Sequence, residues 1–171
     1  MSLSAQNIFK TAKAIDLDVR RELGPPDEGL LAQTQIVLSR SLVRNTRGYI
    51  EKVANQANGC YENGWYDGCA VMLRRLIETL IIETYEKFRI ADKIQTPQGD
   101  FFYLRDLINN CLTEPQWNLS RNCKVALPKL KDLGDKSAHS RRYIAQRGDI
   151  DPILLDVRLV VQELVYLAGI K

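Results

Sequence analysis

Apolar residues recur every three or four positions between Trp65 and Ile90, and this spacing constrains the fold more than any other feature of the chain. At the helical angle of about 100° per residue they fall within one stripe about 100° wide. The stripe consists of Tyr66, Cys69, Leu73, Leu76, Ile77, Leu80, Thr84 and Phe88. A second, mixed stripe carries Val71, Arg75, Glu78 and Ile82. Helices with two apolar sides are central in a bundle or shared with a partner, so the spacing predicts a long central helix over 65–90.

The same spacing predicts helices along the rest of the chain. In the helix expected over 32–62, the polar patch 44–48 predicts a bend or break, because its Gly48 is about 1 kcal/mol less favourable than alanine inside a helix. Pro128 predicts a kink in the fourth. The expected helices cover residues 4–23, 32–62, 101–112, 120–133 (capped by Ser120 and closed by Gly134) and 151–168, the last opened by Asp151-Pro152.

The clearest break in the chain is the segment GPPDEG at residues 24–29. Gly24 favours the left-handed conformation that ends helices, and two prolines cannot continue one. We therefore expect two parts: an N-terminal helix with a linker over residues 1–29, and a helical bundle over residues 30–171.

Composition narrows the class of protein. Of 171 residues, 45% are hydrophobic and 26% are charged, which supports a folded core rather than a disordered chain. No apolar run reaches the roughly 18 residues of a membrane helix, and the N-terminus has no signal-peptide core, so we expect a cytoplasmic protein. The cysteine spacings match no metal motif, and there is one histidine, so we expect buried thiols, no metal and no cofactor.

Charge is distributed unevenly. From Arg121 to Arg147 eight basic residues face only Asp132 and Asp135, which gives this stretch a net charge of +6 in a chain of net charge +3. Such asymmetry points to an anionic partner.

Two segments resemble a known superfamily. The first is Gly64–Glu78, GWYDGCAVMLRRLIE, where an aromatic residue enters a helix that carries an R-x-x-x-E pattern. The second is Leu133–His139, LGDKSAH, a GN-x-x-AH-like turn before an apolar C-terminal helix. Together they resemble the HEPN superfamily, more narrowly its HEPN-like domains of unknown function that accompany restriction and defence proteins. The similarity covers roughly residues 35–170.

The resemblance implies an antiparallel bundle of four to five helices that commonly forms a homodimer. Many HEPN proteins are metal-independent ribonucleases with an R-x(4–6)-H motif, and others are binding or regulatory modules without catalysis. The histidine corresponds to His139. The arginine has no counterpart, because Asp132, Leu133 and Gly134 occupy the matching positions. Asp135 stands where related sequences often have asparagine.

His139 is the candidate catalytic residue. Cleavage of RNA without a metal needs a group that takes a proton from the 2′-hydroxyl, and imidazole suits that step near neutral pH. Two other interpretations remain open: His139 holds the junction between the last two helices, or it binds a ligand. Arg75 or Glu78 would join a polar cluster near it, or Arg74 and Glu78 would form an ordinary surface ion pair across one helical turn.

The remaining candidate binding residues follow or flank His139. Arginine binds phosphate through a forked pair of donors, and tyrosine can stack on a base, which suits nucleic acid or a nucleotide. The alternative is a solvated basic loop. The candidates are Asp135, Lys136, Arg141, Arg142, Tyr143 and Arg147.

Three functions follow. The leading expectation is a non-catalytic module that binds RNA, DNA or a nucleotide, in the defence or toxin–antitoxin setting that the resemblance suggests. The second is a metal-independent RNase centred on His139. The third is a structural oligomerisation or protein-interaction domain. A homodimer through the long or C-terminal helix is expected, with Val161 and Leu164 as interface positions.

Overall fold

The computed structural model describes residues 5–23, of which 20–23 as backbone only, and residues 31–171. These residues are mostly helical and contain no strand beyond one isolated bridge between Gln95 and Phe101, which confirms the all-α class. None of their helices is long and apolar enough to span a bilayer. The chain forms two compact units, residues 1–30 and 31–171, and each is described by itself.

The first unit contains the helix α1 (Ala5–Leu23), as its apolar spacing predicts. The apolar side chains along it are exposed. They are Ile8, Phe9, Ile15, Leu17 and Val19. The predicted linker, GPPDEG at 24–29, lies outside the described residues.

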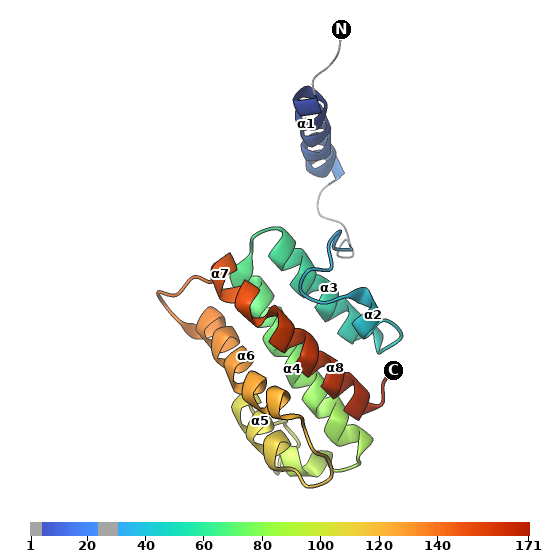
Figure 1. Cartoon of the computed structure of the whole chain (residues 1–171), viewed down its shortest axis with the longest axis vertical. Coiled ribbons are helices and arrows are strands. Elements are labelled where there is room, and N and C mark those ends of the chain that lie inside the picture. The colour runs from blue at the N-terminus through green and yellow to red at the C-terminus, as the bar shows by residue number, and fades with distance from the viewer. Residues whose placement is uncertain (1–4, 24–30) are drawn as a thin grey trace. The chain divides into compact units, whose positions relative to one another are not determined.

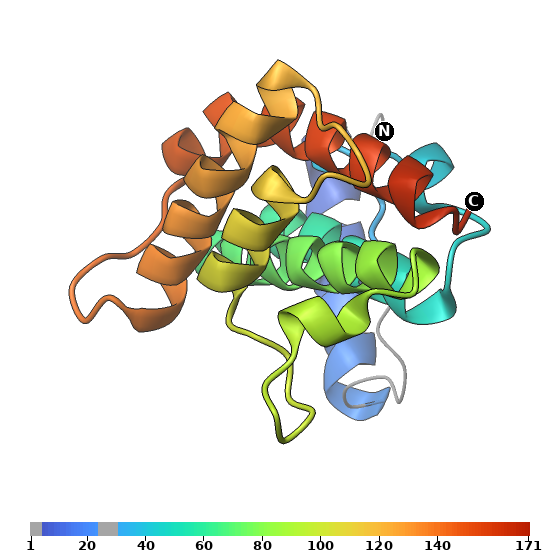
Figure 2. The same cartoon turned by 90° about the horizontal axis from the view of Figure 1, so that it is seen from below.

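The second unit is a helical bundle built around α4 (Tyr66–Lys87). Figures 1 and 2 show α8 and α6 packed beside each other against α4. The other α-helices of this unit are α2 (Arg40–Val43), α3 (Gly48–Glu62), α5 (Leu104–Thr113), α6 (Arg121–His139), α7 (Arg147–Ile150) and α8 (Leu154–Ala168). Two 3₁₀ turns are η1 (Ala91–Ile94) and η2 (Asp151–Ile153).

The central position predicted for residues 65–90 is confirmed, since α4 packs against α3, α5, α6 and α8. Its predicted apolar stripe supplies buried side chains, among them Leu76, Ile77 and Leu80. Helix α8 buries most of its circumference as well. Val161 and Leu164 lie inside this core, so the prediction that they form an interface between subunits is wrong.

The prediction of one helix over 32–62 is wrong in part. Residues 31–39 are irregular, and the chain is interrupted again between α2 and α3, at the polar patch 44–47. The backbone N–H and C=O groups of this irregular segment form hydrogen bonds with side chains from other parts of the chain. The buried Asn58 accepts from the N–H groups of Val37 and Leu38 at 3.1 and 3.0 Å and donates to the Leu38 carbonyl at 2.8 Å.

The fourth predicted helix is longer than expected. Ser120 caps α6 by accepting a hydrogen bond from the Cys123 N–H at 3.2 Å, as predicted. Gly134 does not end the helix, because α6 continues to His139. The predicted turn at Leu133–His139 is therefore the last part of a helix, and the loop begins at Ser140.

A buried glutamate fixes the start of α3 on α4. Glu83 is 5% exposed, accepts a hydrogen bond from the Tyr49 hydroxyl and forms an ion pair with Arg47 at 2.7 Å. Burial raises the pKa of Glu83 above its ordinary value, although Arg47 acts in the opposite direction.

Candidate functional site

Four charged side chains join α4 to α6 near the predicted site. Arg74 Nε lies 2.8 Å from Asp135 Oδ1, and Arg74 Nη1 lies 3.4 Å from Glu78 Oε2. Lys131 Nζ lies 2.7 Å from the other oxygen of Asp135. Burial alone would raise the pKa of Asp135, but the hydrogen bonds from Lys131 and Arg74 outweigh it and hold that pKa below its ordinary value.

This network settles part of the prediction for α4. The i,i+4 pair of Arg74 and Glu78 exists, and Arg74 extends it to Asp135 on another helix. Arg75 does not take part, because it is exposed. Glu78 is half-buried and belongs to the network.

His139 is the last residue of α6 and is exposed. It lies one helical turn after Asp135, but its imidazole forms no hydrogen bond or ion pair with any described residue. The predicted polar cluster therefore forms without the histidine.

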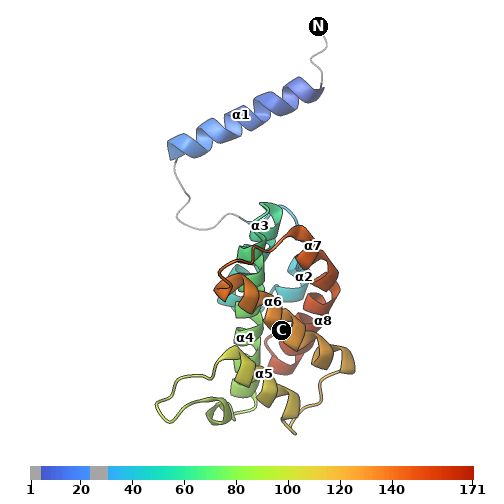
Figure 3. The ribbon, with the colours of Figure 1, turned by 90° about the vertical axis from the view of Figure 1, so that its left-hand side faces the viewer.

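Three cations beside His139 are exposed and free of ion pairs within the described residues: Lys136, Arg141 and Arg142. We call these residues together with His139 the basic tip. Figures 1 and 3 show the loop after α6 extending beside α7, at the end of the bundle where α4 begins. Three positive charges lie in this region without acidic partners among the described residues, and such a surface favours an anionic ligand.

Two other predicted binding residues, Tyr143 and Arg147, form contacts within the protein. Tyr143 is half-buried, and burial together with a hydrogen bond to Asp149 raises its pKa to about 12. Arg147 Nε lies 3.1 Å from Asp151, and its guanidinium lies 5.9 Å from the centre of the Tyr61 ring. The Tyr61 hydroxyl in turn donates to Asp151. The prediction that Tyr143 stacks on a base is not favoured, because its hydroxyl is bound within the protein.

One aromatic residue near the basic tip was missed as a site residue. Trp65 directly precedes α4 and is 66% exposed. The Asp67 carboxylate, two residues later, accepts a hydrogen bond from the Ala145 N–H at 3.0 Å. This bond attaches the loop after α6 to the first turn of α4. Sequence reasoning placed Trp65 only in a motif, and its position before the helix was the available signal.

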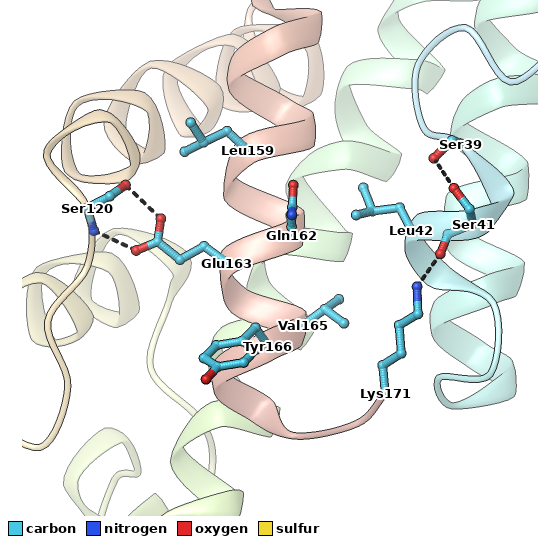
Figure 4. Close-up of a pocket in the computed structure, with 10 residues that line it drawn as sticks. All are labelled: Ser39, Ser41, Leu42, Ser120, Leu159, Gln162, Glu163, Val165, Tyr166 and Lys171. Carbon is cyan, nitrogen blue, oxygen red and sulfur yellow. Dashed lines mark hydrogen bonds between the residues drawn. The ribbon is translucent and has the colours of Figure 1, made fainter.

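A surface cavity of about 880 Å³ lies at the other end of α6. Figure 4 shows it between α8 and α2, with Tyr166 and Gln162 along α8 and Lys171 reaching the Ser41 carbonyl. Glu163 accepts hydrogen bonds from the Ser120 N–H at 2.5 Å and the Ser120 hydroxyl at 2.7 Å. Since Ser120 and His139 flank the length of α6, roughly 28 Å separates this cavity from the basic tip.

No group of three or more potential metal ligands of the His, Cys, Asp or Glu type occurs within the described ranges. The four cysteines are free thiols, of which Cys69, Cys111 and Cys123 are buried.

Comparisons with family models, curated proteins and solved structures gave no match to this chain.

Proposed function

We propose that the chain is a HEPN-like helical module that binds nucleic acid through the basic tip. The observation that carries this proposal is that Lys136, Arg141 and Arg142 are exposed and unpaired, whereas Lys131 and Arg147 in the same basic stretch bind acidic side chains. A protein neutralises phosphates with such free cations. Three cations of the basic stretch, Lys136, Arg141 and Arg142, are thus exposed together beside the end of α6.

The loop that carries these arginines is held in a defined position. The Tyr143 N–H donates to the Ser140 hydroxyl at 3.2 Å, and the Ala145 N–H donates to Asp67 at 3.0 Å. An ordered loop loses less conformational entropy when it binds a ligand than a disordered one does. These bonds support binding by a preformed surface.

Binding is favoured over catalysis. The arginine of the superfamily's ribonuclease motif has no counterpart before His139. A catalytic imidazole also needs a group that orients it, and none of the described residues binds the ring. The RNase centred on His139 is the alternative, and the setting in defence or toxin–antitoxin systems follows from the resemblance.

The test is binding of a labelled mixed RNA pool in EDTA, at low and physiological salt. We expect affinity that falls with salt, and a weaker salt dependence in Arg141→Ala/Arg142→Ala, by a slope of about 1 per lost phosphate contact. Arg40→Ala/Arg44→Ala removes the same charge from exposed positions at α2 and should leave binding nearly unchanged. If both double variants lost the same amount of RNA affinity, the proposal that RNA binds at the basic tip would be wrong.

The same assay examines catalysis. Cleavage of the RNA pool in EDTA that disappears in His139→Ala would favour the RNase alternative. Neither binding nor cleavage would leave the third function, a structural interaction domain.

The proposal includes a homodimer through α8. Leu155 (75% exposed) and Tyr166 (83% exposed) lie eleven residues apart, so they share one helical face with Leu159 and Gln162 between them. This spacing is typical of a helix that packs against another helix. The face also borders the cavity in Figure 4.

The oligomeric state tests that interface. Leu155→Asp/Tyr166→Asp should give a folded monomer in light scattering, whereas Val125→Asp, a change at an exposed valine of α6, should remain a dimer. A dimer that persists in the double variant would refute an interface at α8.

A further inference from the structure

We infer that the basic tip binds single-stranded rather than double-stranded nucleic acid, with one base stacked on Trp65. This inference rests on the proposed function and adds the class of substrate and the residue that contacts a base. It starts from the contrast between the two tryptophans. Trp117 is 8% exposed and packs on Tyr85 and Phe88, while Trp65 is 66% exposed.

Trp65 and the arginines belong to one rigid frame. The bond between Asp67 and Ala145 ties the loop to the start of α4, and the ion pair between Arg74 and Asp135 ties α4 to the end of α6. Chain geometry across the first bond keeps the Cα atoms of Trp65 and Arg142 within roughly 25 Å of each other. A single strand of a few nucleotides covers that span, in line with the 4–16 nucleotides that single-strand binding domains occupy.

The side chains match the requirements of a single strand. Base-stacking on an aromatic ring accepts any base, and cations follow the phosphates. Bases inside a duplex are stacked on one another and cannot reach an indole without being extruded. Ile144, 70% exposed beside Arg142, adds an apolar contact at the tip of the loop.

Tyr143 does not take this role, because Asp149 holds its hydroxyl and the ring is half-buried. Within residues 31–171, the other aromatic residues with comparable exposure are Tyr103, which directly precedes α5, and Tyr166, which lies near the end of α8. Neither segment has a hydrogen bond to the loop that carries Arg141 and Arg142, within the part of the chain described. Trp65 is therefore the aromatic side chain placed to stack.

The experiment uses the full chain and four labelled probes: a 12-nucleotide RNA, a DNA of the same sequence, and the corresponding duplexes. Fluorescence anisotropy gives affinity, and intrinsic emission reports on Trp65, because the buried Trp117 is shielded from the ligand. We expect at least one single strand to bind tighter than its duplex and to quench the emission. Comparison of the RNA probe with the DNA probe then shows which of the two single strands the protein prefers.

Trp65→Ala should weaken single-strand binding about tenfold, within the range measured for lost stacking contacts, and leave the salt dependence unchanged. Trp65→Phe should retain part of the affinity and lose the quenching. Tyr103→Ala, which removes an exposed aromatic ring directly before α5, is the matched control and should bind as the unmodified chain does. Thermal unfolding of each variant verifies that it is folded.

Two results separate failure of this inference from failure of the proposed function. If Trp65→Ala binds as the unmodified chain does, or a duplex binds as tightly as its strands, while Arg141→Ala/Arg142→Ala still weakens binding, the stacking inference is wrong and nucleic-acid binding stands. If no probe binds at low salt, both are wrong.

Discussion

Gly134 of α6 lies against the side chain of Arg74 on α4. A Cβ atom placed on Gly134 would be 2.6 Å from Arg74 Cβ and 3.0 Å from Arg74 Cδ. The absence of a side chain at position 134 thus lets Arg74 cross α6 and reach Asp135, the next residue, at 2.8 Å. The glycine allows α6 and α4 to approach each other closely at this point.

Gly134→Ala should destabilise the protein by about 1–2 kcal/mol, because overpacking at a close contact outweighs the better helix propensity of alanine. Gly59→Ala is the control. Gly59 lies inside α3 with nothing within 4 Å of the corresponding Cβ, so the change should stabilise by about 0.5–1 kcal/mol. Urea unfolding measures both. A neutral Gly134→Ala would show that Arg74 moves aside without loss.

Asp135→Asn should destabilise the protein by about 1–2 kcal/mol at pH 7, because it removes hydrogen bonds made to a charged group. The pKa of Asp135 is lower in the folded chain than its ordinary value of 3.8. Its contribution to stability is therefore present above pH 3.8 and disappears as the pH falls through the folded pKa. Unfolding free energies of both proteins should converge at that acidic end. If the unfolding free energies still differed at that acidic pH, packing rather than charge would cause the loss of stability.

Glu83→Gln should stabilise the protein at pH 7. Burial raises the pKa of Glu83 above 4.5, so this group favours folding in its protonated form and loses that contribution as the pH rises through the folded pKa. The glutamine carbonyl can still accept from Arg47, and its amide N–H can donate to the Tyr49 hydroxyl, without the buried charge. The gain should fade below pH 4.5 in a series of denaturant unfolding experiments. Destabilisation at pH 7 would show that the ion pair with Arg47 outweighs burial.

Thiol reagents should modify Cys60 before the other three cysteines. Burial raises the pKa of all four thiols, but Cys60 is only half-buried, whereas the pKa of Cys69, Cys111 and Cys123 rises to about 12 and their burial excludes reagent. Mass spectrometry of the native chain at pH 8 should show one adduct, and four after unfolding. Rapid double labelling of the folded protein would contradict the buried positions.

The parts of the fold that follow from local spacing were predictable. Helix α4 follows from its apolar stripe, and the cap of α6 follows from Ser120. The irregular segment 31–39 was not predictable, because Asn58 supplies its hydrogen bonds from about 20 residues away. Gly134 was misread for a similar reason: a glycine stands inside this helix because Arg74 of α4 leaves no room for a side chain there, and no local pattern reveals that contact.

Sequence reasoning indicated the exposed basic segment of the candidate site but not the contacts of each member. The basic stretch around His139 indicated the exposed loop, because charged side chains without partners remain at the surface when the chain folds. Sequence reasoning did not reveal that Arg147 and Tyr143 have partners within the protein, Asp151 and Asp149, whose local bonds compete with ligand binding. Trp65 belongs beside the loop only because α4 and the loop are joined by Asp67 and Ala145, 78 residues apart.

The packing of α8 against α4 has a consequence for synthesis on the ribosome. Helix α4 is complete at Lys87, but residues 154–168 emerge only after a further 66 residues have been made. At about 5–20 residues per second, the apolar side of α4 that α8 covers stays open for several seconds. During this interval the nascent chain exposes an apolar helix face, to which a chaperone that recognises apolar segments would bind.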